Sequence, residues 1–282
     1  RDRVLSFAAT NVDVIIATDH DVAHDYSGIV RELGLDTTLA TVVGVETTGH
    51  IPFLYAPGLT FPLVIGHYNF WPIRYQPGMP RFGAPFDELM EPGELFDHTD
   101  PLFVQSAVTI TQFNHPWADP IFGRDLGFAR AIGMSALRDL PEQDDGTANG
   151  MYVRRPKGGH RNNDHVTQEV MNGGRNEQLL AYRQFWFWGL NQGQLKTGTA
   201  NSDSHGLTDD TVGSPRNVVY TDTRIGPAFD INRVNQALRD GRSFGTNGPI
   251  IQAQVDQLGG GEADFGMQLI RPAPAGKLHL EV

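Results

Sequence analysis

Six side chains of types that bind metal ions lie at the ends of apolar stretches far apart in the chain. They are His20, Glu46, His67, His115, Asp203 and His205. A single histidine at the end of a strand is more often hydrogen-bonded than bound to a metal, so each residue alone is weak evidence. Together they recur after five different stretches, and imidazole and carboxylate donors suit Zn, Mn or Fe. The pattern therefore predicts a metal centre that activates water.

The stretches before these residues have the patterns of strands. Residues 12–18 are a short β-branched run that ends at Asp19 and His20, and residues 41–45 are another that ends at Glu46. Further strands are expected at 61–66, 107–113, 166–171, 196–202 and 217–221. Helical spacing is found at 122–140, 177–190 and 231–240, the last followed by Gly241.

Strands that alternate with helices predict an α/β fold with a parallel sheet or barrel. Enzymes of this kind place their chemistry where the strands end, so residues distant in sequence converge there. Two long stretches, 71–105 and 141–159, are expected to be irregular loops.

Composition limits the partners of the chain. Its 282 residues include 22 Lys and Arg against 33 Asp and Glu, a formal net charge of −11. This charge repels nucleic acid and anionic membrane surfaces, so neither is an expected partner. No apolar run approaches the roughly 18 residues of a membrane span. Because the chain has no cysteine, any metal must be held by His, Asp or Glu. The compartment and the oligomeric state are not predicted.

Several of these motifs together carry a family resemblance. They are Ala17-Thr18-Asp19-His20-Asp21, Gly44-Val45-Glu46, Gly66-His67-Tyr68-Asn69-Phe70, Asn114-His115-Pro116, Asn201-Ser202-Asp203-Ser204-His205-Gly206 and Gly213-Ser214-Pro215-Arg216. The chain resembles the PHP (polymerase and histidinol phosphatase) superfamily over most of residues 4–250. Within it, the resemblance is to the CehA/McbA-like metallohydrolases.

The resemblance implies a distorted (βα)7 barrel, expected over residues 1–245, with two or three divalent metal ions (Zn, Mn or Fe). It implies that Glu46 bridges two ions and that His67 and His115 complete one of them. Asp203 and His205 would join different ions, and His20 would bind the outlying one.

This sequence departs from the family at its start. The family begins with an H-x-H strand, which is not found here, and residues 1–10 read as the second half of a helix. The barrel is therefore expected to lack its first strand. Residues 246–282 have the alternation of short strands, which predicts the start of a C-terminal β appendage.

Other residues have two interpretations each. Asp19 is expected either to orient His20 and move a proton or to cap the next turn. Arg216 is expected either to clamp an anionic substrate oxygen or to form a surface salt bridge. Glu169 and Asn172 either line the pocket or belong to a turn. His50 is an alternative to His67, but it precedes Pro52 in a turn-like segment.

The function predicted from these residues is metal-dependent hydrolysis of a small-molecule ester by a metal-bridging hydroxide. A phosphoester substrate is favoured. One alternative is a carboxyl ester or carbamate hydrolase, and a second is a metal-binding module without catalytic activity.

Overall fold

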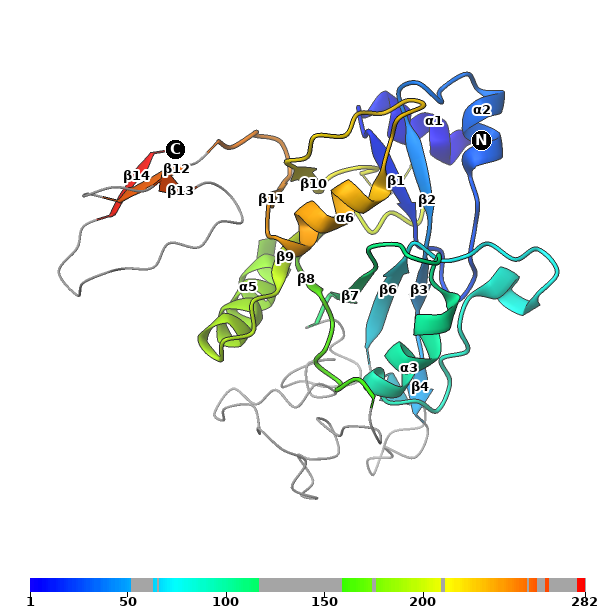
Figure 1. Cartoon of the computed structure of the whole chain (residues 1–282), viewed down its shortest axis with the longest axis horizontal. Coiled ribbons are helices and arrows are strands. Elements are labelled where there is room, and N and C mark those ends of the chain that lie inside the picture. Colours follow the sequence, from blue (N-terminus) through cyan, green and yellow to red (C-terminus); the bar gives the residue numbers. More distant parts are fainter. Residues whose placement is uncertain are drawn as a thin grey trace.

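The computed structural model is a mixed α/β protein (Figure 1). The residues that it describes are 1–51, 63–64, 66–116, 159–173, 176–208, 211–252, 254–257, 262–263 and 278–281.

A five-stranded sheet forms the centre, with the strand order β3-β6-β7-β8-β9. Its strands are β3 (Val45–Thr47), β6 (His67–Trp71), β7 (Ile110–Asn114), β8 (Thr167–Asn172) and β9 (Thr197–Asn201). β6 runs antiparallel to both β3 and β7, whereas β7, β8 and β9 are parallel to one another.

The other strands form smaller sheets. β1 (Val14–Ala17) pairs in parallel with β2 (Ala40–Val43), and β10 (Arg216–Val219) is antiparallel to β11 (Ser243–Thr246). β4 (His50–Ile51) and β5 (Leu63–Val64) form an antiparallel pair. A separate antiparallel sheet contains β12 (Gln254–Gln257), β13 (Glu262–Ala263) and β14 (Leu278–Glu281), and Figure 1 shows it apart from the main body.

Two local contacts join the small sheets to the central one. On one side, β2 continues into β3 through Gly44, where a Cβ would lie 2.9 Å from the Ala17 carbonyl oxygen, so glycine permits the close approach. On the other side, the side-chain amide of Asn217 accepts from the Ala200 N–H and donates to the Ala200 carbonyl, both at 2.8 Å. Asn217 thus replaces backbone pairing between β9 and β10.

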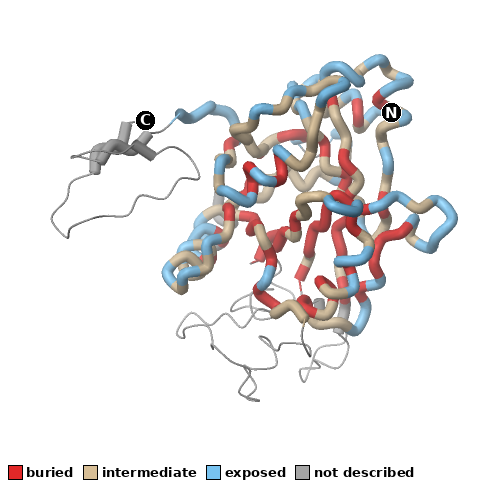
Figure 2. Tube along the Cα trace, viewed as in Figure 1, coloured by how far each residue is buried: buried red, intermediate tan, exposed pale blue. Residues whose placement is uncertain are grey.

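Five α-helices pack around these strands in the described residues: α1 (Asp2–Ala9), α2 (Ser27–Glu32), α3 (Pro92–Thr99), α5 (Asn176–Asn191) and α6 (Ile231–Arg239). Val4 of α1 and Val30 of α2 are buried with Ile15 of β1. Val234 and Leu238 of α6 are buried with Val42 and other residues of a second cluster. Figure 2 shows the buried segments concentrated in the strands.

The α/β class is confirmed, but the described residues form no closed barrel, and part of the sheet is antiparallel rather than parallel. The predicted strands at 12–18, 107–113, 166–171, 196–202 and 217–221 overlap β1, β7, β8, β9 and β10. The predicted helices at 177–190 and 231–240 are confirmed as α5 and α6, and Gly241 follows with φ 72°.

Three expectations about segments need correction or remain open. Residues 71–105 are not wholly irregular, because they contain α3, where Pro92 occupies the first turn and Glu91 and Glu94 form a capping box. The predicted domain boundary between residues 245 and 246 falls within β11 and stays a prediction. The predicted helix at 122–140 lies outside the described residues, as does most of the 141–159 loop.

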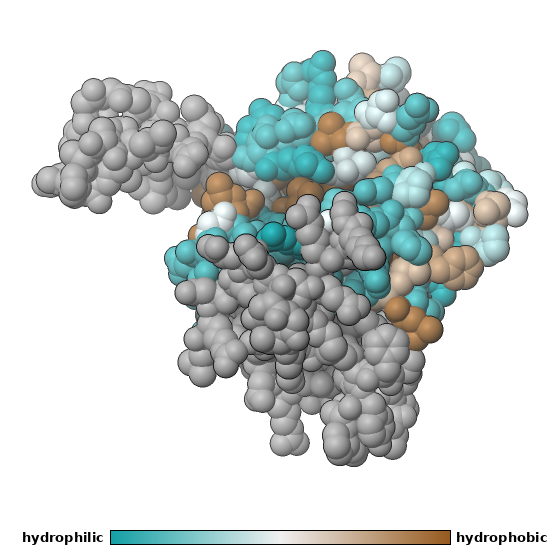
Figure 3. Space-filling model, turned by 60° about the horizontal axis from the view of Figure 1, so that its bottom comes forward, coloured by the Kyte–Doolittle hydropathy of each residue, from teal (hydrophilic) through white to brown (hydrophobic). Residues whose placement is uncertain are grey.

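The surface has mixed polarity. On the face shown in Figure 3, hydrophobic residues of the described part lie scattered among hydrophilic ones. A search of the described helices for one long and apolar enough to cross a membrane finds none.

Candidate metal centre

Three donor atoms from different strands converge at the edge of the central sheet. His67 Nδ1 lies 3.1 Å from Glu46 Oε1 and 2.8 Å from His115 Nε2. The third separation, from His115 Nε2 to Glu46 Oε1, is 3.6 Å. Glu46 is 5% exposed and His115 is 8% exposed, so the group is largely shielded from solvent.

The other three predicted ligands lie beside this group. The His20 ring is centred 5.6 Å from that of His67 and stacks at 5.7 Å on that of His205. His20, Glu46 and His67 each offer a donor atom, all within 4.8 Å of one another. Asp203 is linked to the group through Asn172 Nδ2, which donates to Asp203 Oδ2 at 3.0 Å. The structure therefore brings all six residues together.

The direction of β6 explains how His67 reaches this position. The expected strand at 61–66 overlaps β5, which ends at Val64, and His67 is the first residue of the next strand, β6. Because β6 runs antiparallel to β7, its first residue lies opposite Asn114, the last residue of β7. His67 is thus the correct neighbour for His115, although the predicted reason was wrong.

The pKa values of the side chains in this group depend on burial and on one another. Burial alone would raise the pKa of Glu46, but the hydrogen bond with His67 and the charges of His115, His67 and His20 lower it to about 2. Burial would lower the pKa of His115, but its hydrogen bond with Glu169 and nearby carboxylates raise it to about 9. For His67, burial dominates and lowers the pKa. A carboxylate surrounded by imidazoles is thus kept ionised in a buried position.

The spacing of these donors fits a shared cation. Ligands about 2.0 to 2.1 Å from a tetrahedral Zn²⁺ are roughly 3.3 Å apart, close to the three separations found here. Two predicted ligands also have left-handed backbones, with φ 23° at His115 and φ 45° at Asp203. Such conformations cost of order 1 to 3 kcal/mol in non-glycine residues and concentrate at functional sites.

Three polar residues behind His115 complete the group. Glu169 Oε2 accepts from the His115 backbone N–H at 2.6 Å and lies 3.2 Å from His115 Nδ1. Its other oxygen, Oε1, accepts from Asn201 Nδ2 at 2.8 Å, and Asn172 Nδ2 donates to Oε2 at 3.1 Å. Glu169 and Asn172 therefore line the pocket, and Asn172 also precedes a turn at Gly173. No role was predicted for Asn201.

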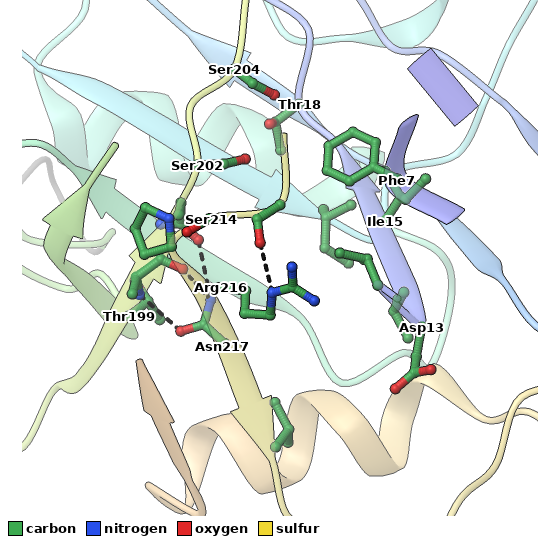
Figure 4. A pocket seen from close by; sticks show the side chains of 18 of the residues that line it. Phe7, Asp13, Ile15, Thr18, Thr199, Ser202, Ser204, Ser214, Arg216 and Asn217 are labelled. Carbon is green, nitrogen blue, oxygen red and sulfur yellow. Dashed lines mark hydrogen bonds between the residues drawn. The ribbon is translucent and has the colours of Figure 1, made fainter. Parts of the chain in front are cut away.

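Glu46 and His115 of this group line a cavity of about 1290 Å³. Its wall includes residues from β1, β3 and each strand from β6 to β11, so these strands line one space. Figure 4 shows Phe7 and Ile15 on one side of this cavity and Asn217 and Thr199 on the other. The volume is large enough for a small organic molecule.

Asp19 and Arg216 also line the cavity. The contacts of Asp19 are with Tyr26 and His24 rather than with His20, and those of Arg216 are with backbone oxygens. Asp19 accepts from the Tyr26 hydroxyl at 3.0 Å and lies 3.4 Å from His24 Nδ1. Burial, and then Asp19, raise the pKa of Tyr26 to about 12, so this hydroxyl keeps its proton.

Arg216 donates from Nε to the Gly213 carbonyl and from Nη1 to the Thr10 carbonyl, both at 2.6 Å. These bonds fasten β10 to the segment before β1. They direct the guanidinium to backbone oxygens, and the role of Arg216 toward a substrate stays a prediction.

A second group of possible ligands lies elsewhere on the surface, formed by Asp97, Asp100 and His160. His160 Nε2 is 3.0 Å from Asp100 Oδ2, and the side chains of both residues are more than a third exposed. Exposed pairs of this kind are common without an ion, so we assign no site there.

Comparisons with protein-family models, with curated proteins and with solved structures find no significant match.

Proposed function

We propose that this protein is a metal-dependent hydrolase of small-molecule esters. The observation that carries the proposal is the convergence of Glu46 Oε1, His67 Nδ1 and His115 Nε2 within 3.6 Å of one another in a buried position. Three such atoms would repel one another if each presented a lone pair, so a proton or a cation must lie among them. A cation is favoured because three more potential ligands lie next to them.

Glu46, His67 and His115 would hold one ion, and His20, Asp203 and His205 would help to hold the other ion or ions. Two or three divalent ions (Zn, Mn or Fe) suit this set of imidazole and carboxylate donors. Ions bound there would supply a water molecule of lowered pKa and would polarise the ester oxygen.

The chain's own residues would position the substrate and exclude bulk water. The cavity beside the donor group admits a small ester, and its wall is polar near Asn69, Gln112 and Asn114. Tyr26 retains its proton at neutral pH, so its hydroxyl can act as a donor but not as a base.

The finer fold assignment is part of the same proposal. We propose that the described strands belong to a distorted (βα)7 barrel of PHP type. This is supported by the eight described strands that line one cavity, which are β1, β3 and β6 to β11. It is also supported by the backbone bond from Asp21 N to Glu46 O, 2.8 Å, which extends the pairing of β1 toward the central sheet. Among the described strands, β1 pairs only with β2 and β10 only with β11, and the cavity lies between them.

Phosphoesters are the favoured substrates because the family resemblance favours them, and because bound cations would offset the acidic net charge locally. The test compares hydrolysis of p-nitrophenyl phosphate, bis-p-nitrophenyl phosphate and p-nitrophenyl acetate by protein incubated with Zn²⁺, Mn²⁺ or Fe²⁺. Faster hydrolysis of a phosphate substrate supports the proposal, whereas faster hydrolysis of the acetate favours the carboxyl ester alternative. Bound metal without hydrolysis of any of the three would favour a binding module.

A further inference from the structure

We propose that Glu169 is a positioning residue of the metal centre, which holds His115 by Nδ1 so that Nε2 faces the metal. This inference rests on the proposed function, because it assigns His115 Nε2 as a ligand. Sequence reasoning gave Glu169 only a place in the pocket wall, with no partner.

Glu169 is fixed more tightly than a pocket-lining carboxylate needs to be. It is 2% exposed, and donors surround both of its oxygens. Oε2 accepts from the His115 backbone N–H and from Asn172 Nδ2, and Oε1 accepts from Asn201 Nδ2. These donors come from β8, β9 and the end of β7, so the carboxylate cannot rotate without losing several hydrogen bonds.

The position of Glu169 relative to the ring determines which nitrogen can bind a cation. Glu169 Oε2 is 3.2 Å from His115 Nδ1, whereas His115 Nε2 is 2.8 Å from His67 Nδ1. An ionised carboxylate only accepts hydrogen bonds, so the ring nitrogen beside it carries the proton. A cation at this site would then bind through Nε2, which faces His67 at 2.8 Å and Glu46 at 3.6 Å. Partners of this kind commonly orient metal-binding histidines.

Glu169 also holds the backbone of the same histidine. His115 has φ 23°, a left-handed conformation that its side chain disfavours. The 2.6 Å bond from its backbone N–H to Glu169 Oε2 stabilises this conformation. One carboxylate oxygen therefore fixes both the backbone and the ring of His115.

The test uses two variants of Glu169 and one matched control, all in the full chain. Glu169→Gln keeps the shape and an oxygen that can accept from Nδ1, and Glu169→Ala removes both. Thr167→Val is the control, because Thr167 lies on the same strand, is fully buried, and donates to Gln112 Oε1 at 3.3 Å rather than to His115. Circular dichroism establishes that each variant is folded.

The first readout is Zn²⁺ affinity, measured by competition with a chromophoric chelator. We expect a loss of about 10- to 100-fold for Glu169→Ala, the usual effect of removing such a partner. A loss of about 3- to 10-fold is expected for Glu169→Gln, because a neutral amide oxygen is a weaker acceptor. The control should bind within about twofold of wild type, because it leaves the histidine partner intact.

The second readout is the tautomer of His115 in the Zn²⁺-loaded protein, from long-range ¹H–¹⁵N correlation spectra. Wild type should carry the His115 proton on Nδ1. If wild type binds Zn²⁺ and both Glu169 variants bind it equally tightly, the positioning role is wrong and the metal centre stands. If His115 of the wild type carries its proton on Nε2, the positioning role of Glu169 is likewise wrong and the metal centre stands. If wild type binds no Zn²⁺, the proposed function fails and the role of Glu169 fails with it. Should Glu169→Ala not fold, the affinity of Glu169→Gln decides.

Discussion

Glu46 is a buried carboxylate whose nearest titratable neighbours are imidazoles. Burying a carboxylate is unfavourable unless it is paired, and here His67 and His115 supply the pairing. The same arrangement leaves an oxygen and two nitrogens directed at one point. At the scale of single residues, this is the feature that distinguishes a candidate metal centre from a set of surface histidines.

The Glu46→Gln variant should lose bound metal and hydrolytic activity. The amide keeps the volume but removes the charge that attracts a cation, so we expect activity to fall by at least about 100-fold. Metal content by elemental analysis and p-nitrophenyl phosphate hydrolysis measure the two effects. Glu32→Gln is the matched control, because the Glu32 side chain is 56% exposed and pairs with Arg1. Equal metal content in the two variants would contradict the role of Glu46.

At this scale the sequence predicted the residue types well and their partners poorly. All six predicted ligands come together, because each lies within four residues of the end of a strand. The partners of Glu169 could not be predicted, since His115 and Asn201 are 54 and 32 residues away in the chain. The one available signal was its position near the end of the predicted strand at 166–171.

Among the elements, β9 and β10 are joined by a side chain instead of a backbone ladder. Asn217 makes hydrogen bonds to both backbone groups of Ala200, a residue that is 1% exposed. Sequence patterns predict strands but not this kind of junction, because an asparagine at the start of a strand normally indicates a turn.

Asn217→Ala should therefore destabilise the protein. The N–H and C=O of Ala200 would lose their partners in a buried position, at a cost of about 1 to 3 kcal/mol in the free energy of unfolding. Urea denaturation measures the loss. Asn191→Ala, at the exposed end of α5, is the control and should change stability by less than about 0.5 kcal/mol. A loss no larger for Asn217→Ala than for this control would contradict the proposed junction.

Lys196, just before β9, is hydrogen-bonded to the segment that precedes β8. Its Nζ donates to the carbonyl of Asn163 at 2.8 Å and to that of His165. Burial lowers the pKa of Lys196 to about 8, although the charge of Asp164 acts in the opposite direction. The folded state therefore binds this proton less tightly than the unfolded state does.

The sign of the resulting pH dependence follows from this lowered pKa. The contribution of Lys196 to the free energy of unfolding is most favourable above its unfolded pKa near 10.5. It is lost as the pH falls through the folded pKa of about 8. Between pH 7.5 and pH 9.5, the unfolding free energy of wild type should rise relative to Lys196→Met by roughly 1 to 2 kcal/mol. Denaturation of both proteins at the two pH values measures the difference. A difference that does not change with pH would show that Lys196 is not perturbed by burial.

At the scale of the described part of the molecule, strands from several sheets line a large cavity, and Glu46 and His115 lie in its wall. Alternation of strands and helices in the sequence correctly indicated an α/β protein. It did not indicate the antiparallel course of β6, because the apolar pattern of a strand does not encode its direction. Between β3 and β6, the described residues contain the antiparallel pair of β4 and β5.

Metal binding should stabilise the whole fold, because the donors from β3, β6 and β7 come together only when the sheet forms. A ligand at 100 times its dissociation constant adds about 2.7 kcal/mol to the unfolding free energy. Zn²⁺ should therefore raise the melting temperature by several degrees, and a chelator should reverse the rise. The same addition should leave Glu46→Gln unchanged, and an equal rise in both proteins would indicate binding elsewhere.

The most direct test of the metal centre is anomalous X-ray diffraction from crystals of the Zn²⁺-loaded protein, recorded on both sides of the zinc absorption edge. We predict an anomalous peak about 2.0 to 2.2 Å from Glu46 Oε1, His67 Nδ1 and His115 Nε2. Zinc found only at the surface group of Asp97, Asp100 and His160, or no peak among the three buried donors, would contradict the account.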